Sequence, residues 1–152
     1  MKKYDKVLFV SHSDTCRGPM AEAIMQRLVL LEDILIDSKG MIVLFPEPVN
    51  PKAADVLRMN GQELQEHMAV PFTVDDFDDR TLILTMEEAQ KEKLLKDYPA
   101  QAKNLYTLLE YIGRSGDIYD PIGKDLPEYG KCFHILEAII QEIAKVLREE
   151  NQ

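Results

Sequence analysis

The sequence predicts one α/β domain over residues 1–152, with a central four-stranded parallel sheet between two layers of helices. A length of 152 residues is typical of one domain, which usually spans roughly 100–200 residues. Hydrophobic residues make up 45% and charged residues 30%, which is ordinary for a globular protein and excludes disordered and fibrous classes. Short apolar runs alternate with amphipathic stretches, and this alternation favours parallel strands covered by helices on both faces.

The first apolar run, residues 7–10, has β-branched residues at both ends and predicts a central strand buried on both faces. A helix is expected next, with Pro19 in its first turn and apolar residues at three- and four-residue spacing as far as Leu31. Residues 34–36 predict a second strand, and residues 42–44 predict a further one. The chain therefore opens with a strand, a polar loop and a helix.

The remaining elements follow the same alternation. Asn50 is expected to cap a helix that has Pro51 in its first turn and ends near Gly61. The later predictions are a strand at residues 82–84, a charged helix at 87–98, a strand at 104–109, a loop at 113–127 and a long final helix. The apolar face of the final helix consists of Phe133, Leu136, Ile140, Ile143 and Leu147.

The charge balance limits the classes of partner. Lysine and arginine number 18 against 27 acidic residues, which gives a formal net charge of −9 and a pI near 4.8. We therefore expect no nucleic-acid partner, because such binding depends mainly on cationic contacts with phosphates. No apolar run approaches the ~18 residues of a membrane span, and the N-terminal run is too short for a signal peptide, so we expect no membrane partner.

The cysteine count bears on the compartment. Cys16 and Cys132 are too few for a disulfide scaffold or for a zinc site made of cysteines alone. They favour a reducing environment, and we expect a cytoplasmic monomer that uses no metal and no cofactor. Both residues are interpreted as buried structural cysteines, although Cys16 lies where a redox-sensing thiol is also conceivable.

Other groups of ligand-type residues do not predict a metal site. His134 lies two residues from Cys132 on the predicted final helix, so the two side chains point in different directions. His67 has no cysteine or histidine at ligand spacing. An acidic cluster lacks the glycine and glutamate of a calcium loop and is interpreted as a solvated helix start. This cluster consists of Asp75, Asp76, Asp78 and Asp79.

The first loop is the candidate functional site. Residues 11–17 lie between the first strand and a helix N-terminus, where several backbone N–H groups and the helix dipole favour an anion. Arg17 adds a planar fork of donors that matches two phosphate oxygens. The alternative is a polar turn that binds nothing. The predicted phosphate-binding residues are His12, Ser13, Asp14, Thr15, Cys16 and Arg17.

This opening resembles the low-molecular-weight protein tyrosine phosphatases. Their loop reads C-x5-R-S/T-P-M-A-E-A, and here the same spacing to Arg17 is followed after one residue by Pro-Met-Ala-Glu-Ala at residues 19–23. Residues 37–40, Asp-Ser-Lys-Gly, resemble the D-S-A-G segment of the family, and Asp120-Pro121 resembles its late D-P pair. The resemblance covers the whole chain and implies one phosphatase-like domain over residues 1–152 that binds phosphorylated protein, a small phosphomonoester or inorganic phosphate.

The resemblance also implies catalytic roles. In the family a cysteine thiolate attacks phosphorus, the loop arginine holds the phosphoryl oxygens and the D-P aspartate protonates the leaving group. Carried over by position, Arg17 holds the phosphoryl group and Asp120 is the acid, but the nucleophile position is Ser11. Cys16 corresponds to the second cysteine of the family loop and not to the attacking one.

Three more loop positions depart from the family pattern. Ser13 replaces glycine, Asp14 replaces asparagine, and Gly18 replaces serine or threonine. A thiol starts near pKa ~8.5 and a loop of this kind can lower it, whereas a hydroxyl starts near ~15.7 and needs a general base. We therefore expect impaired catalysis. Two explanations stay open: a natural phosphate-binding pseudo-phosphatase, or a serine introduced to trap a complex. The altered neighbours favour natural divergence.

The substrate class is indicated by two residues. Thr15 occupies a position where tyrosine-directed members of the family commonly have isoleucine and arginine-directed members have threonine. Ile122 follows the D-P pair where tyrosine-directed members place an aromatic ring against the substrate. Both residues favour phosphoarginine, although each is equally explained by local packing.

Overall fold

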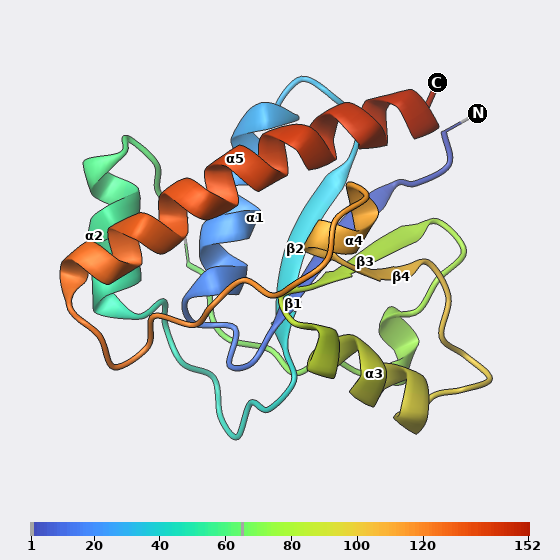
Figure 1. Cartoon of the computed structure of the whole chain (residues 1–152), viewed down its shortest axis with the longest axis horizontal. Coiled ribbons are helices and arrows are strands. Elements are labelled where there is room, and N and C mark those ends of the chain that lie inside the picture. Colours follow the sequence, from blue (N-terminus) through green and yellow to red (C-terminus); the bar gives the residue numbers. More distant parts are fainter. Residues whose placement is uncertain (1, 65) are drawn as a thin grey trace.

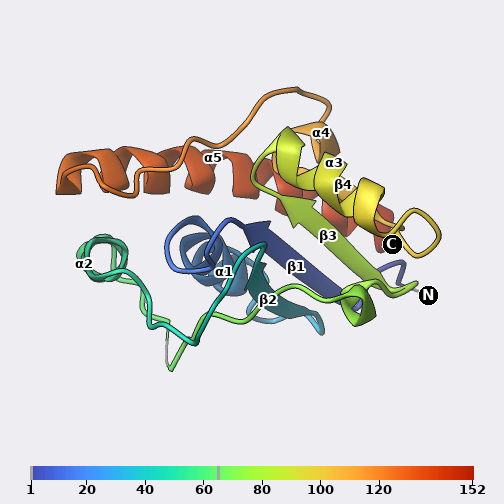
Figure 2. The same cartoon turned by 90° about the horizontal axis from the view of Figure 1, so that it is seen from below.

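A four-stranded parallel sheet forms the centre of the protein. The computed structural model describes residues 2–64 and 66–152. The strands are β1 (Lys6–Ser11), β2 (Leu35–Gly40), β3 (Thr81–Thr85) and β4 (Leu105–Thr107), in the order β2-β1-β3-β4. All three pairings are parallel, and the arrows of β1 and β3 point the same way in Figure 2. The predicted three-layer α/β class with four parallel strands is confirmed.

The helices lie in two layers. On one face are α1 (Arg17–Leu28), α2 (Pro51–Met59) and α5 (Leu126–Glu150), and their apolar residues share one core cluster with Val7 and Phe9 of β1. On the other face, α3 (Glu88–Asp97) contributes Leu94 to a second cluster with Leu8 and Val10. Figure 1 shows the two layers on opposite sides of the sheet. The alternation of β1 side chains between the two clusters explains its unbroken apolar run.

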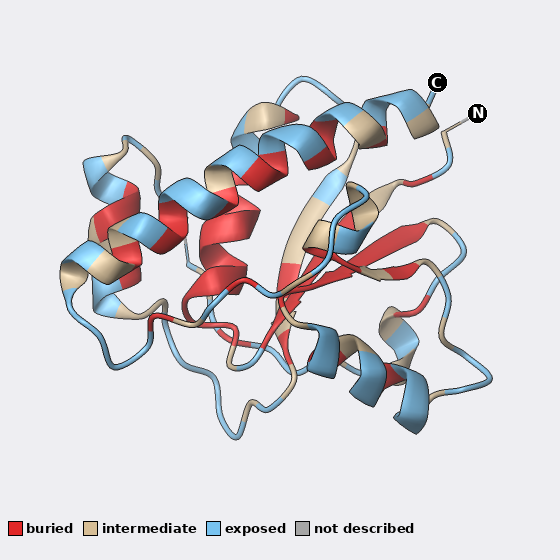
Figure 3. Cartoon of the chain, in the orientation of Figure 1, coloured by how far each residue is buried: buried red, intermediate tan, exposed pale blue. Residues whose placement is uncertain are grey.

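The inner strands are the most buried part of the fold. Every residue of β3 is buried, as is every residue of β1 after Lys6, whereas β2 at the sheet edge is mostly half-buried (Figure 3). The predicted face of α5 is also confirmed, because its five predicted apolar residues are all buried. Asn50 caps α2 as predicted, with its side chain accepting the amide of Lys52 at 2.9 Å.

One predicted strand is wrong, and the first helix is shorter than predicted. Residues 42–44 form no strand: the amides of Met41 and Ile42 bond to the carbonyls of Ser11 and His12, and the chain then leaves the sheet edge with Leu44 exposed. The first helix does not reach Leu31, which is 99% exposed, because α1 ends at Leu28 and a turn follows. Apolar composition alone cannot distinguish these exposed residues from buried ones.

The predicted strand at residues 104–109 is shorter than expected, because its second half starts a helix. Thr107 caps α4 (Leu108–Tyr111), with its hydroxyl accepting the amide of Glu110 at 2.9 Å. The carboxylate of Glu110 accepts the amide of Thr107 in return, at 3.3 Å. This capping box is a threonine followed three residues later by glutamate, a signal that was present in the sequence.

The acidic cluster lies at a short 3-10 helix, η1 (Val74–Asp76), as expected for a helix start. Asp76 accepts the amide of Thr73 and pairs with Lys39 at 2.8 Å, so it holds this segment against β2. Among the described residues, no helix is long and apolar enough to cross a membrane.

Gly40 positions the first loop against the end of β2. A Cβ at Gly40 would lie 2.7 Å from Val43 Cγ2, 3.0 Å from the carbonyl carbon of Ser13 and 3.1 Å from the amide nitrogen of Asp14. Two of these atoms belong to backbone and cannot move aside cheaply. The loop can therefore approach the strand this closely only where β2 ends in glycine.

We expect Gly40→Ala to destabilise the fold by about 1–3 kcal/mol through overpacking, measured as a lower midpoint of urea unfolding at unchanged slope. Gly130→Ala is the matched control, because a Cβ there meets nothing within 4 Å and should stabilise α5 by about 0.5–1 kcal/mol. A Gly40→Ala protein as stable as the wild type would contradict this account of the loop.

Candidate functional site

The candidate site begins where β1 ends at Ser11 and α1 begins at Arg17. Within the described chain, the amides of residues 12, 13 and 15–17 donate no hydrogen bond to another residue. Asp14 has a left-handed backbone with φ 59°, which turns the chain sharply at the centre of the loop. Free amides on a turned loop that leads into a helix form a favourable environment for an anion.

Ser11 is buried at the start of this loop, with 2% of its surface exposed. Its hydroxyl oxygen accepts the amide of Asp14 at 3.2 Å and, among the described residues, donates to no acceptor. A Cβ at Gly18 would lie 3.0 Å from the Ser11 hydroxyl and 3.0 Å from the Asp14 carboxylate. The glycine therefore leaves space that a serine or threonine would fill.

The side chain of Asp14 lies beneath the loop, because the residue is fully buried. Its Oδ2 accepts the amide of Val70 at 3.2 Å and lies 3.4 Å from His67 Nε2, which also lies 3.0 Å from the Asp14 carbonyl. Its Oδ1 has no hydrogen-bond partner in the part of the chain that the structure describes. Sequence reasoning placed this carboxylate among phosphate-facing groups, but the left-handed backbone turns it into the protein.

A second buried carboxylate lies behind His67. Glu22 of α1 accepts the hydroxyl of Ser38 at 2.9 Å, and its Oε1 lies 3.8 Å from His67 Nδ1. Burial raises the pKa of Glu22 to about 7. Burial also opposes protonation of His67, but the hydrogen bond and charge of Asp14 outweigh it and raise the pKa of the imidazole. Sequence spacing gave no sign of this contact, because His67 lies far along the chain from the loop.

Arg17 is held from three sides. Its side chain is 1% exposed, and its Nη1 donates to Glu87 Oε2 at 2.7 Å and to the carbonyl of Ile118 at 2.6 Å. Its Nη2 lies 3.4 Å from Asp120 Oδ2. A buried guanidinium is costly unless its charge and donors are matched, and these partners match them. The structure therefore brings together Arg17 and Asp120, which are 103 residues apart in the sequence.

Glu87 is a site residue that sequence reasoning missed. It directly follows β3 and its neighbour Met86, at the same sheet edge as Ser11. Polar residues just beyond the carboxyl ends of parallel strands often form binding sites. The position of Glu87 after a predicted strand could therefore have identified it as a site residue. The side chain of Asp120 is also held within its own loop, because its Oδ1 accepts the amide of Ile122 at 3.1 Å.

The other predicted loop residues are three polar residues and one cysteine. His12 is exposed and Ser13 is half-buried, and the Ser13 and Thr15 hydroxyls lie 2.7 Å apart. Cys16 and Cys132 are buried free cysteines, as expected, and burial raises the pKa of both thiols well above the ordinary range. The loop therefore contains no thiolate at neutral pH.

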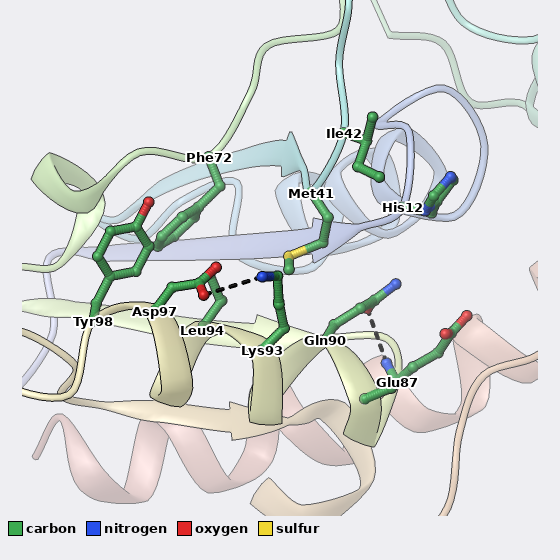
Figure 4. Close-up of a pocket in the computed structure, with 11 residues that line it drawn as sticks. His12, Met41, Ile42, Phe72, Glu87, Gln90, Lys93, Leu94, Asp97 and Tyr98 are labelled. Atoms are coloured by element: carbon green, nitrogen blue, oxygen red, sulfur yellow. Dashed lines mark hydrogen bonds and ion pairs between the residues drawn. The ribbon is translucent and has the colours of Figure 1, made fainter.

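A pocket of about 320 Å³ lies beside the loop, between α3 and the segment that follows β2 (Figure 4). His12, Ile42 and Glu87 line the end near the loop, whereas Phe72 and Tyr98 lie together at the far end. Glu87 thus borders the pocket and also holds Arg17. No cluster of three or more metal-ligating side chains is present among residues 2–64 and 66–152.

Comparison with known proteins identifies relatives with the same architecture. Residues 6–152 match the family described as low molecular weight phosphotyrosine protein phosphatase. The low molecular weight protein-tyrosine-phosphatase PtpB of Staphylococcus haemolyticus is 29% identical over 142 residues, which cover 91% of this chain and 96% of that protein. The protein-arginine-phosphatase of Bacillus subtilis is 27% identical over 150 residues, which cover 96% and 99%.

One similar solved structure also has a serine in its active site. It is a mutant of the YwlE arginine phosphatase that carries a phosphorylated active-site serine. It superimposes with a TM-score of 0.88 at 28% identity, and the match covers 95% of this chain and 97% of that one.

The buried carboxylate of Glu22 predicts a pH-dependent stability. Its pKa is raised from 4.5 to about 7, so its contribution is fully present below about pH 4.5 and is lost as the pH rises towards 7. The raised pKa of His67 also makes the fold less stable as the pH rises, over a higher pH range than that of Glu22. We expect Glu22→Gln to remove part of this decline. The unfolding free energy of the variant, relative to that of the wild type, should therefore rise between about pH 5 and about pH 7.

Urea unfolding at several pH values measures this difference. Glu92→Gln, at an exposed position of α3, controls for the loss of one carboxylate. If Glu22→Gln and the wild type decline in parallel over the whole range, the buried network does not titrate as described.

Proposed function

Because this chain belongs to the low molecular weight phosphotyrosine protein phosphatase family, we propose that it binds the phosphoryl group of phosphorylated proteins in loop 11–17 without steady turnover. The observation that carries this proposal is the serine at the nucleophile position, at the end of β1 and beside a buried, oriented arginine. The groups that would bind the phosphoryl group are retained, whereas the cysteine thiolate that would attack it is absent.

Binding is supported by the free loop amides and by the state of Arg17. Glu87 and the Ile118 carbonyl hold Nη1 and fix the plane of the guanidinium, while among the described residues Nη2 has only the longer contact with Asp120. A phosphate oxygen can therefore take Nη2 without displacing the shorter bonds. Charge-assisted pairing of this kind is worth roughly 1.5–3 kcal/mol. Inorganic phosphate and small phosphomonoesters would be held by the same donors.

The lack of turnover follows from the acidity of the nucleophile. A serine hydroxyl and a cysteine thiol differ by about 7 pKa units, which corresponds to roughly 10 kcal/mol at neutral pH. No loop arginine supplies that difference. Asp120 would still protonate a leaving group, as its position in the family pattern implies, but protonation of the leaving group does not replace an attacking anion.

The related mutant structure favours a second candidate function, covalent capture. There, the active-site serine of an arginine phosphatase mutant is phosphorylated, so a serine in such a loop can hold a phosphoryl group. By analogy, Ser11 would keep a transferred phosphoryl group as phosphoserine. Capture and simple binding share the absence of steady turnover.

The substrate class that we propose is phosphoarginine. Thr15 supports it, because its hydroxyl is oriented by Ser13 at 2.7 Å, and Ile122 supports it as a half-exposed aliphatic residue beside Asp120. The similar proteins include both tyrosine and arginine phosphatases at nearly equal identity, so they do not separate the two classes.

The wider organisation that we propose is one phosphatase-like domain over residues 1–152, acting as a cytoplasmic monomer with no nucleic-acid or membrane partner. Its support is the match over residues 6–152, the net charge of −9 and the two free cysteines.

We expect the wild-type protein to show no steady release of nitrophenolate from para-nitrophenyl phosphate, and Ser11→Cys to gain at least about a thousandfold in rate. That gain corresponds to only about 4 kcal/mol of the difference between the two nucleophiles. Phosphoarginine and phosphotyrosine peptides, given side by side to the same variant, measure its preference, and we expect the arginine peptide to react faster.

Ser11→Ala is the control for both proteins. Steady wild-type turnover that disappears in Ser11→Ala would contradict the proposal, because it would show that serine is a competent nucleophile. A Ser11→Cys protein that gains nothing would also contradict the assignment of the defect to Ser11 and would place it in Ser13, Asp14 or Gly18.

A further inference from the structure

We propose that Asp14 is the proton acceptor for Ser11, so that Ser11 takes one phosphoryl group from a donor with a good leaving group. This inference rests on the proposed function, since it requires the phosphoryl group to bind in loop 11–17. It rests on the fully buried carboxylate of Asp14, whose Oδ1 has no hydrogen-bond partner among residues 2–64 and 66–152. A buried acceptor without a partner carries a desolvation cost, and a proton from a nearby hydroxyl removes that cost.

The carboxylate and the hydroxyl lie on either side of the space left by Gly18. Both Asp14 Oδ1 and Ser11 Oγ would lie 3.0 Å from a Cβ at Gly18, so the two oxygens border the same small space. The amide of Asp14 already donates to Ser11 Oγ at 3.2 Å, which leaves the hydroxyl proton free to point elsewhere. Oδ1 is the unpaired acceptor in that space, and Gly18 keeps it clear of a side chain.

The rest of Asp14 is held in place. Its Oδ2 accepts the amide of Val70 at 3.2 Å and lies 3.4 Å from His67 Nε2, and its carbonyl also contacts that imidazole. These contacts occupy one carboxylate oxygen and leave Oδ1 at the space beside Gly18, which Ser11 Oγ also borders. His67 is therefore a positioning residue, whereas Asp14 itself receives the proton.

The step balances without any added reactant. The proton of the Ser11 hydroxyl moves to Asp14 Oδ1 while Oγ forms a bond to phosphorus. The bond from phosphorus to the leaving oxygen breaks, and its electron pair leaves with a phenolate such as nitrophenolate. Arg17 and the free loop amides neutralise the phosphoryl oxygens during transfer.

The reaction stops after one transfer because of the product. Phosphoserine has an alkoxide leaving group near pKa ~15.7, compared with ~8.5 for the thiolate of a phosphocysteine, so water displaces it far more slowly. Asp14 thus makes Ser11 an acceptor of one phosphoryl group and does not make the chain a steady hydrolase.

Rapid mixing with para-nitrophenyl phosphate tests the proposal. We expect the wild type to release a single equivalent of nitrophenolate and to gain the mass of one phosphoryl group at Ser11, located by peptide mass spectrometry. Asp14→Asn keeps the shape of the side chain but accepts no proton, so its burst rate should fall at least about a hundredfold, the equivalent of about 2.7 kcal/mol. Its affinity for inorganic phosphate should be equal to or tighter than that of the wild type.

Ser11→Ala should show no burst, and Ser115→Ala, at an exposed loop serine outside the site, should match the wild type. An unchanged burst in Asp14→Asn would overturn the inference, as would acid-labile phosphate on His12. Bound inorganic phosphate without any phosphoserine would overturn the inference alone. No binding of inorganic phosphate would overturn the proposed function and this inference with it.

Discussion

The buried guanidinium of Arg17 is the interaction on which the site depends. It joins the N-terminus of α1 to Glu87 after β3 and to the segment that carries Ile118 and Asp120. Removing a charge from water costs several kcal/mol, and only matched partners make the arrangement tolerable. Arg17 and these partners come from three separate parts of the chain, so the cation that holds them together is also the one that we propose to face an anion. The site therefore forms only in the folded chain, where these distant segments meet at Arg17.

The carboxylates around this cation give the site its second constraint. The chain has a net charge of −9, and Glu87 and Asp120 lie directly on Arg17. An incoming phosphate is attracted by local donors against an unfavourable overall field, which salt screens over about 8 Å. Asp14 adds a further carboxylate, but it lies fully buried under the loop and against His67, and we propose that it acts on Ser11 more directly than on the ligand. The departures at Ser11, Asp14 and Gly18 thus form one changed unit.

The sequence was sufficient for the parts of this account that depend on local pattern. The run in β1, the spacing to Arg17 and the late Asp120 identified the fold and the family, because buried strands and loop motifs are written in neighbouring residues. Contacts between distant segments are not written locally, so Glu87 and His67 could not be assigned from spacing alone. Residues 42–44 were wrongly predicted as a strand for a related reason: the apolar side chains of Ile42 and Leu44 stay exposed where the chain leaves the sheet beside the loop.

Titration with inorganic phosphate, followed by the backbone amide signals in NMR spectra, tests whether Arg17 and the loop amides hold a phosphate. We expect saturable shifts at residues 12–17, and an affinity lower by about tenfold or more in Arg17→Lys, because an ammonium cannot reproduce the fork that Glu87 and Ile118 orient. Phosphate that shifts no loop amide, or that binds Arg17→Lys as tightly as the wild type, would contradict it.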